Sequence, residues 1–106
     1  MGEEFAIDRK VLAVVNPKAG QGRAGRRWAK LKTSLTRPDW ELDEAFTTAP
    51  GDATLITRDA IHAGYDVVLA VGGDGTVNEV VKGFFNGENL IDRDVHLGVV
   101  PAGSGG

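Results

Sequence analysis

The residues best suited to chemistry in this 106-residue chain stand together as Gly72-Gly73-Asp74-Gly75-Thr76. They follow a continuous apolar run, 67–71, and lead into residues at helical spacing. A glycine-rich turn between a strand and a helix leaves backbone amides open to an anion, and the helix adds partial positive charge at its first turn. Asp74 would repel a phosphate unless a divalent cation lay between them or the phosphate were held by other groups. The segment therefore predicts a site for a nucleotide phosphate with Mg²⁺.

The Asp-Gly pair in this segment also matches the turn of a two-residue β-hairpin. The residues that follow argue against a hairpin, because Thr76 and Glu79 match the capping-box pattern that opens a helix. We therefore predict a helix over 77–85, closed by Asn86-Gly87. Its apolar positions recur at helical spacing: Val77, Val80, Val81, Phe84 and Phe85.

Strand and helix patterns alternate along the whole chain. We predict strands at 11–15, 40–47, 67–71 and 97–100, the second of them a half-exposed edge strand. Two more helices are predicted, one ending before Pro38 and one opening at Gly51-Asp52 and closing at Gly64. Their apolar stripes are Ala24, Trp28, Leu31 and Leu35 in the first, and Ala53, Ile56, Ala60 and Ala63 in the second. The order βαβαβαβ predicts an α/β fold: a doubly wound parallel sheet in three layers, with helices on both faces.

This architecture predicts where a ligand would bind. In doubly wound sheets the crevice lies at the carboxyl ends of the strands, where the winding direction switches, commonly between the first and third strands. The loops 16–22 and 72–76 follow those two strands, so we expect them to face each other. The glycine-rich segment 101–106 would lie beside them on the next strand.

The loop 16–22 matches neither a Walker A loop nor the G-x-G-x-x-G dinucleotide fingerprint. Asn16 is a candidate partner for a base or ribose, and Lys18 and Arg23 are placed to reach phosphates. Thr47 and Thr48 would either turn a hydroxyl into the crevice or satisfy the backbone of their own turn. We interpret the remaining basic side chains of this region as the solvent-exposed face of an amphipathic helix: Arg26, Arg27, Lys30 and Lys32.

Composition excludes several classes of function. The net charge of −3 provides no field that would attract nucleic acid. Without cysteine the chain forms neither disulfides nor thiolate metal sites, and His62 and His96 lack partners at metal-ligand spacing. We expect one cytosolic domain with no membrane span or signal peptide. The glycine-rich loop at its end suggests that it belongs to a longer protein.

Taken in order, four motifs resemble the catalytic domain of diacylglycerol kinases of the soluble bacterial type. They are Asn16-Pro17-Lys18-Ala19-Gly20; Thr47 with Gly51-Asp52-Ala53; Gly72 to Glu79; and Pro101-Ala102-Gly103-Ser104-Gly105. The resemblance covers nearly all of the chain after about residue 10. NAD kinases and phosphofructokinases share the Gly-Gly-Asp-Gly core, but Asn78-Glu79 and the Pro-x-Gly-Ser ending favour the lipid-kinase branch. Gly106 departs from the pattern, since it stands where the family has asparagine.

The resemblance implies an ATP-dependent lipid kinase that phosphorylates a diacylglycerol-like or sphingoid-like hydroxyl with ATP and Mg²⁺, in phospholipid metabolism. Residues 1–106 would be the ATP-binding, N-terminal domain of a two-domain enzyme, related to the NAD kinase/phosphofructokinase-like fold. They would be cut at their C-terminal end and inactive alone, because the general base and most of the lipid pocket belong to an absent β-rich domain. Asp74 would organise Mg²⁺ and phosphates indirectly. The implied ATP-site residues are Asn16, Pro17, Lys18, Ala19, Gly20, Thr47, Gly72, Gly73, Asp74, Gly75, Thr76, Val77, Asn78 and Ser104.

Two other functions stay open on the residues alone: a non-catalytic nucleotide-sensing module and an enzyme similar to NAD kinase. For the whole enzyme, a homodimer and peripheral contact with the inner face of the membrane are also open. We expect the full-length protein in the cytoplasm.

Overall fold

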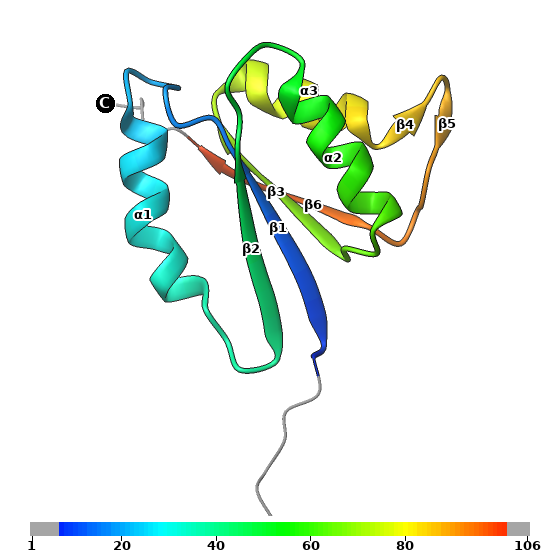
Figure 1. The fold of residues 1–106 in the computed structure, drawn as a ribbon, viewed down its shortest axis with the longest axis horizontal. Helices are drawn as coiled ribbons and strands as arrows, with labels where there is room; N and C mark the ends of the chain where they lie inside the picture. The colour runs from blue at the N-terminus through cyan, green and yellow to red at the C-terminus, as the bar shows by residue number, and fades with distance from the viewer. Residues whose placement is uncertain (1–6, 102–106) are drawn as a thin grey trace, which may run out of the picture.

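The computed structural model describes residues 7–101. Its main sheet contains β1 (Arg9–Val15), β2 (Trp40–Phe46), β3 (Val67–Gly72) and β6 (His96–Pro101), all parallel, in the order β2-β1-β3-β6. The helices α1 (Arg23–Leu35), α2 (Asp52–His62) and α3 (Asp74–Gly83) connect the strands, as Figure 1 shows. The predicted doubly wound α/β fold is confirmed.

The sheet lies between two helical layers. Side chains alternate along a strand, so β1 contributes to both faces. Ala13 and Val15 pack with Trp28 of α1, whereas Leu12 and Val14 belong to the core under α2 and α3. All of Val11–Val15 is buried, as a central strand covered on both faces requires. The predicted three-layer arrangement is therefore present.

Both edges of the described sheet carry exposed apolar side chains. On β2, Phe46 is 48% exposed, which agrees with the predicted half-exposed edge strand. On β6, Leu97 and Val99 are 40% and 51% exposed. The inner strands β1 and β3 hold most of the buried strand residues, so they form the centre of the packed core.

The predicted start and end of the third helix are wrong. α3 begins at Asp74 with Gly73 as N-cap and no side-chain capping bond, so Thr76 and Glu79 do not form a capping box. Thr76 is buried in the first turn and packs over Gly72, where a methyl group would lie 2.8 Å from the Thr76 Cβ. The Asn86-Gly87 pair, predicted to close the helix, lies instead in a hairpin of β4 (Phe85–Asn86) and β5 (Asn89–Leu90).

The buried face of α2 also differs from the prediction. Ala53 and Ala60 are buried as expected, but Thr57 and Ile61 complete the face, while Ala63 is exposed. The reason is the close approach of α3: a Cβ on Gly83 would lie 2.6 Å from the Thr57 Cβ. Packing between two helices, rather than the sequence pattern of one, selects the side chains that are covered.

Candidate functional site

The topology brings three loops to one edge of the sheet. From β1 the chain crosses to β2 on one side and then returns to β3 on the other, so the winding direction switches at β1. The loops after β1, β2 and β3 therefore meet at the carboxyl ends of these strands. A pocket of about 430 Å³ lies between them.

The pocket collects residues from all three loops and from the first turns of α2 and α3. Seven of the residues implied for the ATP site line it: Asn16, Lys18, Ala19, Thr47, Gly73, Gly75 and Thr76. Six others lie in the same loops, at the end of β3 or in α3 but do not line the pocket: Pro17, Gly20, Gly72, Asp74, Val77 and Asn78. Ser104 lies outside the described residues. The rest of the lining is Thr48, Ala49, Pro50, Ala53 and Glu79.

Asn16 joins the first loop to the third. Its backbone amide donates to the Val71 carbonyl at 2.9 Å, and its side-chain Nδ2 donates to the Thr76 hydroxyl oxygen at 3.4 Å. Its Oδ1 accepts a bond from the Lys18 amide at 3.3 Å. The Asn16 side chain therefore holds the two loops in register, and its contact with a base or ribose stays a prediction.

The first loop turns sharply before α1. Gly20, Gln21 and Gly22 all have positive φ, at 62°, 61° and 92°, a conformation that only glycine adopts without cost. This turn carries the chain from the pocket-lining residues Asn16, Lys18 and Ala19 into α1. The first turn of α1 contains no acidic residue, and its Arg23 and Ala24 amides donate to the Gly20 and Ala19 carbonyls, both at 3.2 Å.

The three glycines of the third loop differ in role. Gly72 is buried beneath Thr76 and has no room for a side chain. At Gly73 and Gly75 an added Cβ would have no atom within 4 Å, and both residues line the pocket. Their amides belong to the first turn of α3, where amides lack partners within the helix. This is the geometry in which a helix amino end binds a phosphate.

Asp52 organises the second loop. Its Oδ2 accepts bonds from the Thr48 amide and hydroxyl, both at 2.8 Å, and from the Ala49 amide at 3.0 Å. These bonds, above all that of the Thr48 amide, lower the pKa of Asp52 below its ordinary value. The Thr48 hydroxyl therefore satisfies its own turn. The sequence analysis did not assign this role to Asp52. A local signal for it exists, because a Thr stands four residues before an Asp that begins a helix.

The pocket combines an exposed lysine, hydroxyl groups and open glycine amides. Such a set suits an anion attached to a polar organic group. Within residues 7–101, no cluster of three or more Asp, Glu, His or Cys side chains could hold a metal ion. Asp74, exposed in the first turn of α3, thus fits Mg²⁺ as one ligand at most, with phosphates supplying others.

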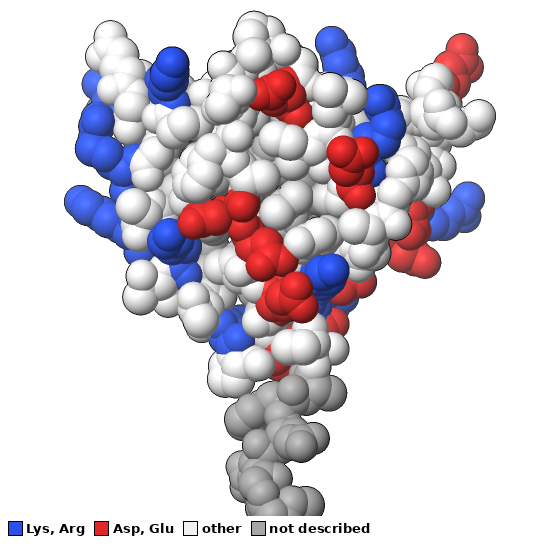
Figure 2. Space-filling model, viewed as in Figure 1, with Lys and Arg blue, Asp and Glu red and all other residues white. Residues whose placement is uncertain are grey.

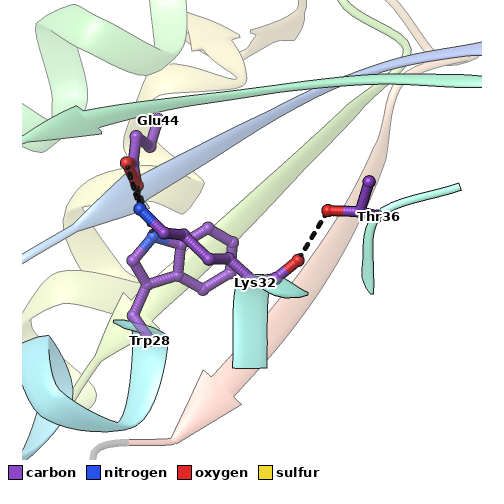
Figure 3. Close-up of polar contacts among 4 residues, drawn as sticks. All are labelled: Trp28, Lys32, Thr36 and Glu44. Atoms are coloured by element: carbon purple, nitrogen blue, oxygen red, sulfur yellow. Dashed lines mark hydrogen bonds and ion pairs between the residues drawn. The ribbon is translucent and has the colours of Figure 1, made fainter. Parts of the chain in front are cut away.

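A second hollow, of about 770 Å³, lies between α1 and β2. Three of its polar side chains are paired with one another: Trp28 Nε1 donates to Glu44 Oε2 at 2.7 Å, and Lys32 Nζ lies 3.0 Å from Glu44 Oε1 (Figure 3). The Trp28 bond, followed by the Lys32 bond, lowers the pKa of Glu44 below its ordinary value. None of the residues predicted for the ATP site lines this hollow.

On the face drawn in Figure 2 the charges are partly separated, and the side of the view opposite α1 carries both signs. Lys and Arg gather on the side of α1, whereas acidic side chains form a run over β2 (Figure 2). No helix among residues 7–101 has the length and apolar character needed to cross a bilayer.

Comparison with known proteins identifies the family. The family model for the diacylglycerol kinase catalytic domain matches residues 10–106. Two curated relatives, diacylglycerol kinases of Staphylococcus aureus strains bovine RF122 / ET3-1 and MRSA252, are each 35% identical over 96 residues, covering 91% of this chain. A solved diacylglycerol kinase structure from Bacillus anthracis str. Sterne is 33% identical over 88% of this chain, with a TM-score of 0.66.

The chain is shorter than these relatives. It spans 29% of the two Staphylococcus aureus proteins and 32% of the Bacillus anthracis chain. The family match nevertheless covers every loop of the pocket as the structure describes it. The chain therefore belongs to the diacylglycerol kinase catalytic domain family.

Proposed function

We propose that this chain is the ATP-binding portion of a lipid kinase that transfers the γ-phosphate of ATP to a lipid hydroxyl. The observation that carries the proposal is the single pocket at which the loops after β1, β2 and β3 meet. Membership of the diacylglycerol kinase family supports a kinase. The lipid would be diacylglycerol-like or sphingoid-like.

Each side of the pocket has a proposed task. The open amides at Gly73 and Gly75 would bind phosphate oxygens, and Lys18 would neutralise part of their charge. Asp74 would act on phosphate-bound Mg²⁺, which supplies charge neutralisation in phosphoryl transfer. Most of the catalysis in such transfers is positioning and electrostatic stabilisation, so a rigid rim suits the task.

The proposed domain organisation follows from the lengths of the relatives. Residues 1–106 would be the nucleotide-binding domain of a longer cytoplasmic enzyme, since the chain spans 29–33% of its relatives. The general base and most of the lipid pocket would lie in the remaining part. We therefore propose that this chain alone binds ATP without transferring phosphate.

Calorimetric titration of the chain with ATP, with and without Mg²⁺, tests the proposed site. We expect weak binding of ATP that becomes stronger with Mg²⁺. We expect no binding of NAD, and binding of NAD would instead favour an enzyme similar to NAD kinase. A folded chain that gives no heat with ATP in either condition contradicts the site. Transfer from labelled ATP to diacylglycerol by the full-length protein tests the reaction, and ATP binding without transfer would favour a nucleotide sensor.

A further inference from the structure

One side chain of α3 holds the amino end of α2 beside the pocket. Glu79 lines the pocket, and its Oε1 accepts a hydrogen bond from the Gly51 amide at 3.1 Å. Its backbone carbonyl accepts a second bond, from the Thr54 hydroxyl, at 2.7 Å. Gly51 is the N-cap of α2, with φ of 92°. A residue 28 positions later in the chain therefore satisfies an amide at the start of α2.

The loop held by this bond forms one wall of the pocket. Thr48, Ala49 and Pro50 line the pocket and are exposed. The loop begins from a fixed point, because the Thr47 amide donates to the Val15 carbonyl at 2.9 Å. The bonds to Asp52 then connect the loop to its own helix. The Glu79 carboxylate connects the end of the loop to α3, and so to the opposite wall.

The packing of α2 on α3 has a separate basis. At Gly83 an added Cβ would lie 2.6 Å from the Thr57 Cβ and 2.7 Å from the Thr54 carbonyl oxygen, so the helices touch there through backbone and a buried threonine. That contact lies one turn beyond Glu79 and involves neither its carboxylate nor the loop. Removing the carboxylate should therefore free the loop while the two helices stay packed.

We infer that Glu79 is a positioning residue: its carboxylate fixes residues 48–51 at the distance from α3 that the nucleotide site requires. The inference rests on the proposed ATP site. Glu79 would act through the Gly51 amide rather than through contact with phosphates, which a carboxylate repels. A glutamine at this position keeps an acceptor oxygen, whereas an alanine does not.

The test compares Glu79→Ala and Glu79→Gln in the whole chain, with Asp59→Ala as the matched control. Asp59 is an exposed residue of α2, and its removal changes the net charge equally. The first measurement is the Gly51 amide resonance without ligand, which reports the hydrogen bond directly. The second is the affinity for ATP with Mg²⁺.

In Glu79→Ala we expect an upfield shift of the Gly51 amide proton and a Kd raised about tenfold, the effect of losing one charge-assisted hydrogen bond. Glu79→Gln should restore the downfield position of Gly51 and most of the affinity, and Asp59→Ala should match the unsubstituted chain. An unchanged Gly51 resonance in a folded Glu79→Ala variant overturns the inference. So does an unchanged affinity when the resonance has moved.

The two measurements separate this inference from the proposed function. If the unsubstituted chain does not bind ATP, the ATP site fails, and the Gly51 resonance still decides whether Glu79 holds the loop. If Glu79→Gln loses as much affinity as Glu79→Ala, the carboxylate acts by its charge, and the positioning role is wrong.

Discussion

The indole nitrogen of Trp28 donates a 2.7 Å hydrogen bond to a carboxylate oxygen of Glu44, and this bond ties α1 to the edge strand β2. Trp28 is 1% exposed, so its N–H has no alternative in water. The carboxylate is held from a second direction by Lys32 Nζ at 3.0 Å. One face of the three-layer fold thus depends on a polar contact as well as on apolar packing.

Glu44→Ala should lower the free energy of unfolding by about 1–3 kcal/mol, because a buried N–H donor is left without a partner. Glu44→Gln keeps an acceptor and should cost less. Urea unfolding measures both, with Glu41→Ala, an exposed position on the same strand, as the control. Equal effects of the Glu44 and Glu41 variants would show that the Trp28 bond contributes nothing.

Stability should decrease in acid through Glu44 and Asp52. Hydrogen bonds lower the pKa of each carboxyl group in the folded state, from ordinary values of 4.5 and 3.8. The stabilisation is therefore complete above those values and is lost as the pH falls through the lower folded-state pKa. We expect the free energy of unfolding to be nearly constant from neutral pH to about pH 5 and to decrease below it.

Glu44→Gln should reduce the steepness of that decrease, since the glutamine does not titrate. Unfolding curves collected at several acidic pH values provide the measurement. An identical dependence on pH in the variant and the unsubstituted chain would contradict the role of Glu44 in acid stability.

Tyr65 should ionise only in strong alkali. Its hydroxyl donates to Asp43 Oδ2 at 2.6 Å, and this bond, with burial and the negative charges of Asp43 and Glu41, raises the pKa to about 12 from an ordinary 10.0. The folded state favours the protonated phenol, so its stabilising effect is present below pH 10 and is lost as the pH rises toward about 12.

The measurement for Tyr65 is simple, because it is the single tyrosine of the chain. Ultraviolet absorbance of the phenolate should show one late transition in the folded protein, and Asp43→Ala should move it toward the value in denaturant. Asp59→Ala serves as the charge control. A transition near pH 10 in the folded, unsubstituted chain would contradict the Asp43 bond.

The glycines of the third loop should separate stability from binding. Gly72→Ala places a methyl group 2.8 Å from the Thr76 Cβ, so we expect a loss of about 1–3 kcal/mol in unfolding free energy. Gly75→Ala has open space and a helical position, so stability should be kept or should rise by about 0.5–1 kcal/mol, while ATP binding weakens. Thermal melting measures the stability of both variants, and ATP titration measures their affinity. A destabilised Gly75→Ala variant would show that Gly75 is required for packing rather than for binding.

Asp74→Asn in the full-length enzyme should reduce kcat at least tenfold, or about 1.4 kcal/mol of transition-state stabilisation, if the carboxylate acts on metal-bound phosphate. Stability should change little, because Asp74 is exposed and contributes mainly its charge at the start of α3. The opposite pattern, a melting point many degrees lower with full activity per folded molecule, would make Asp74 a structural residue.

Local chemistry in the sequence was sufficient for the fold class and for the position of the pocket. The buried strands are continuous apolar runs, such as residues 11–15, and the unfavourable contact of apolar side chains with water is enough to predict that they are buried. The alternation of these runs with helical patterns dictates a parallel sheet, and a parallel sheet brings its loops to one edge. The glycine segment 72–76 was likewise readable, because the conformational freedom of glycine is a local property.

Only the tertiary structure decided the partners of the polar side chains. Glu79 matches a local capping box, yet it bonds Gly51 on another helix, because Thr76 is needed to cover Gly72 and lies inside the first turn. The buried face of α2 and the hairpin after α3 were missed for the same reason. A side chain takes the partner that packing brings nearest, and contacts such as that of Gly83 with Thr57 depend on how two helices cross, which neither local pattern contains.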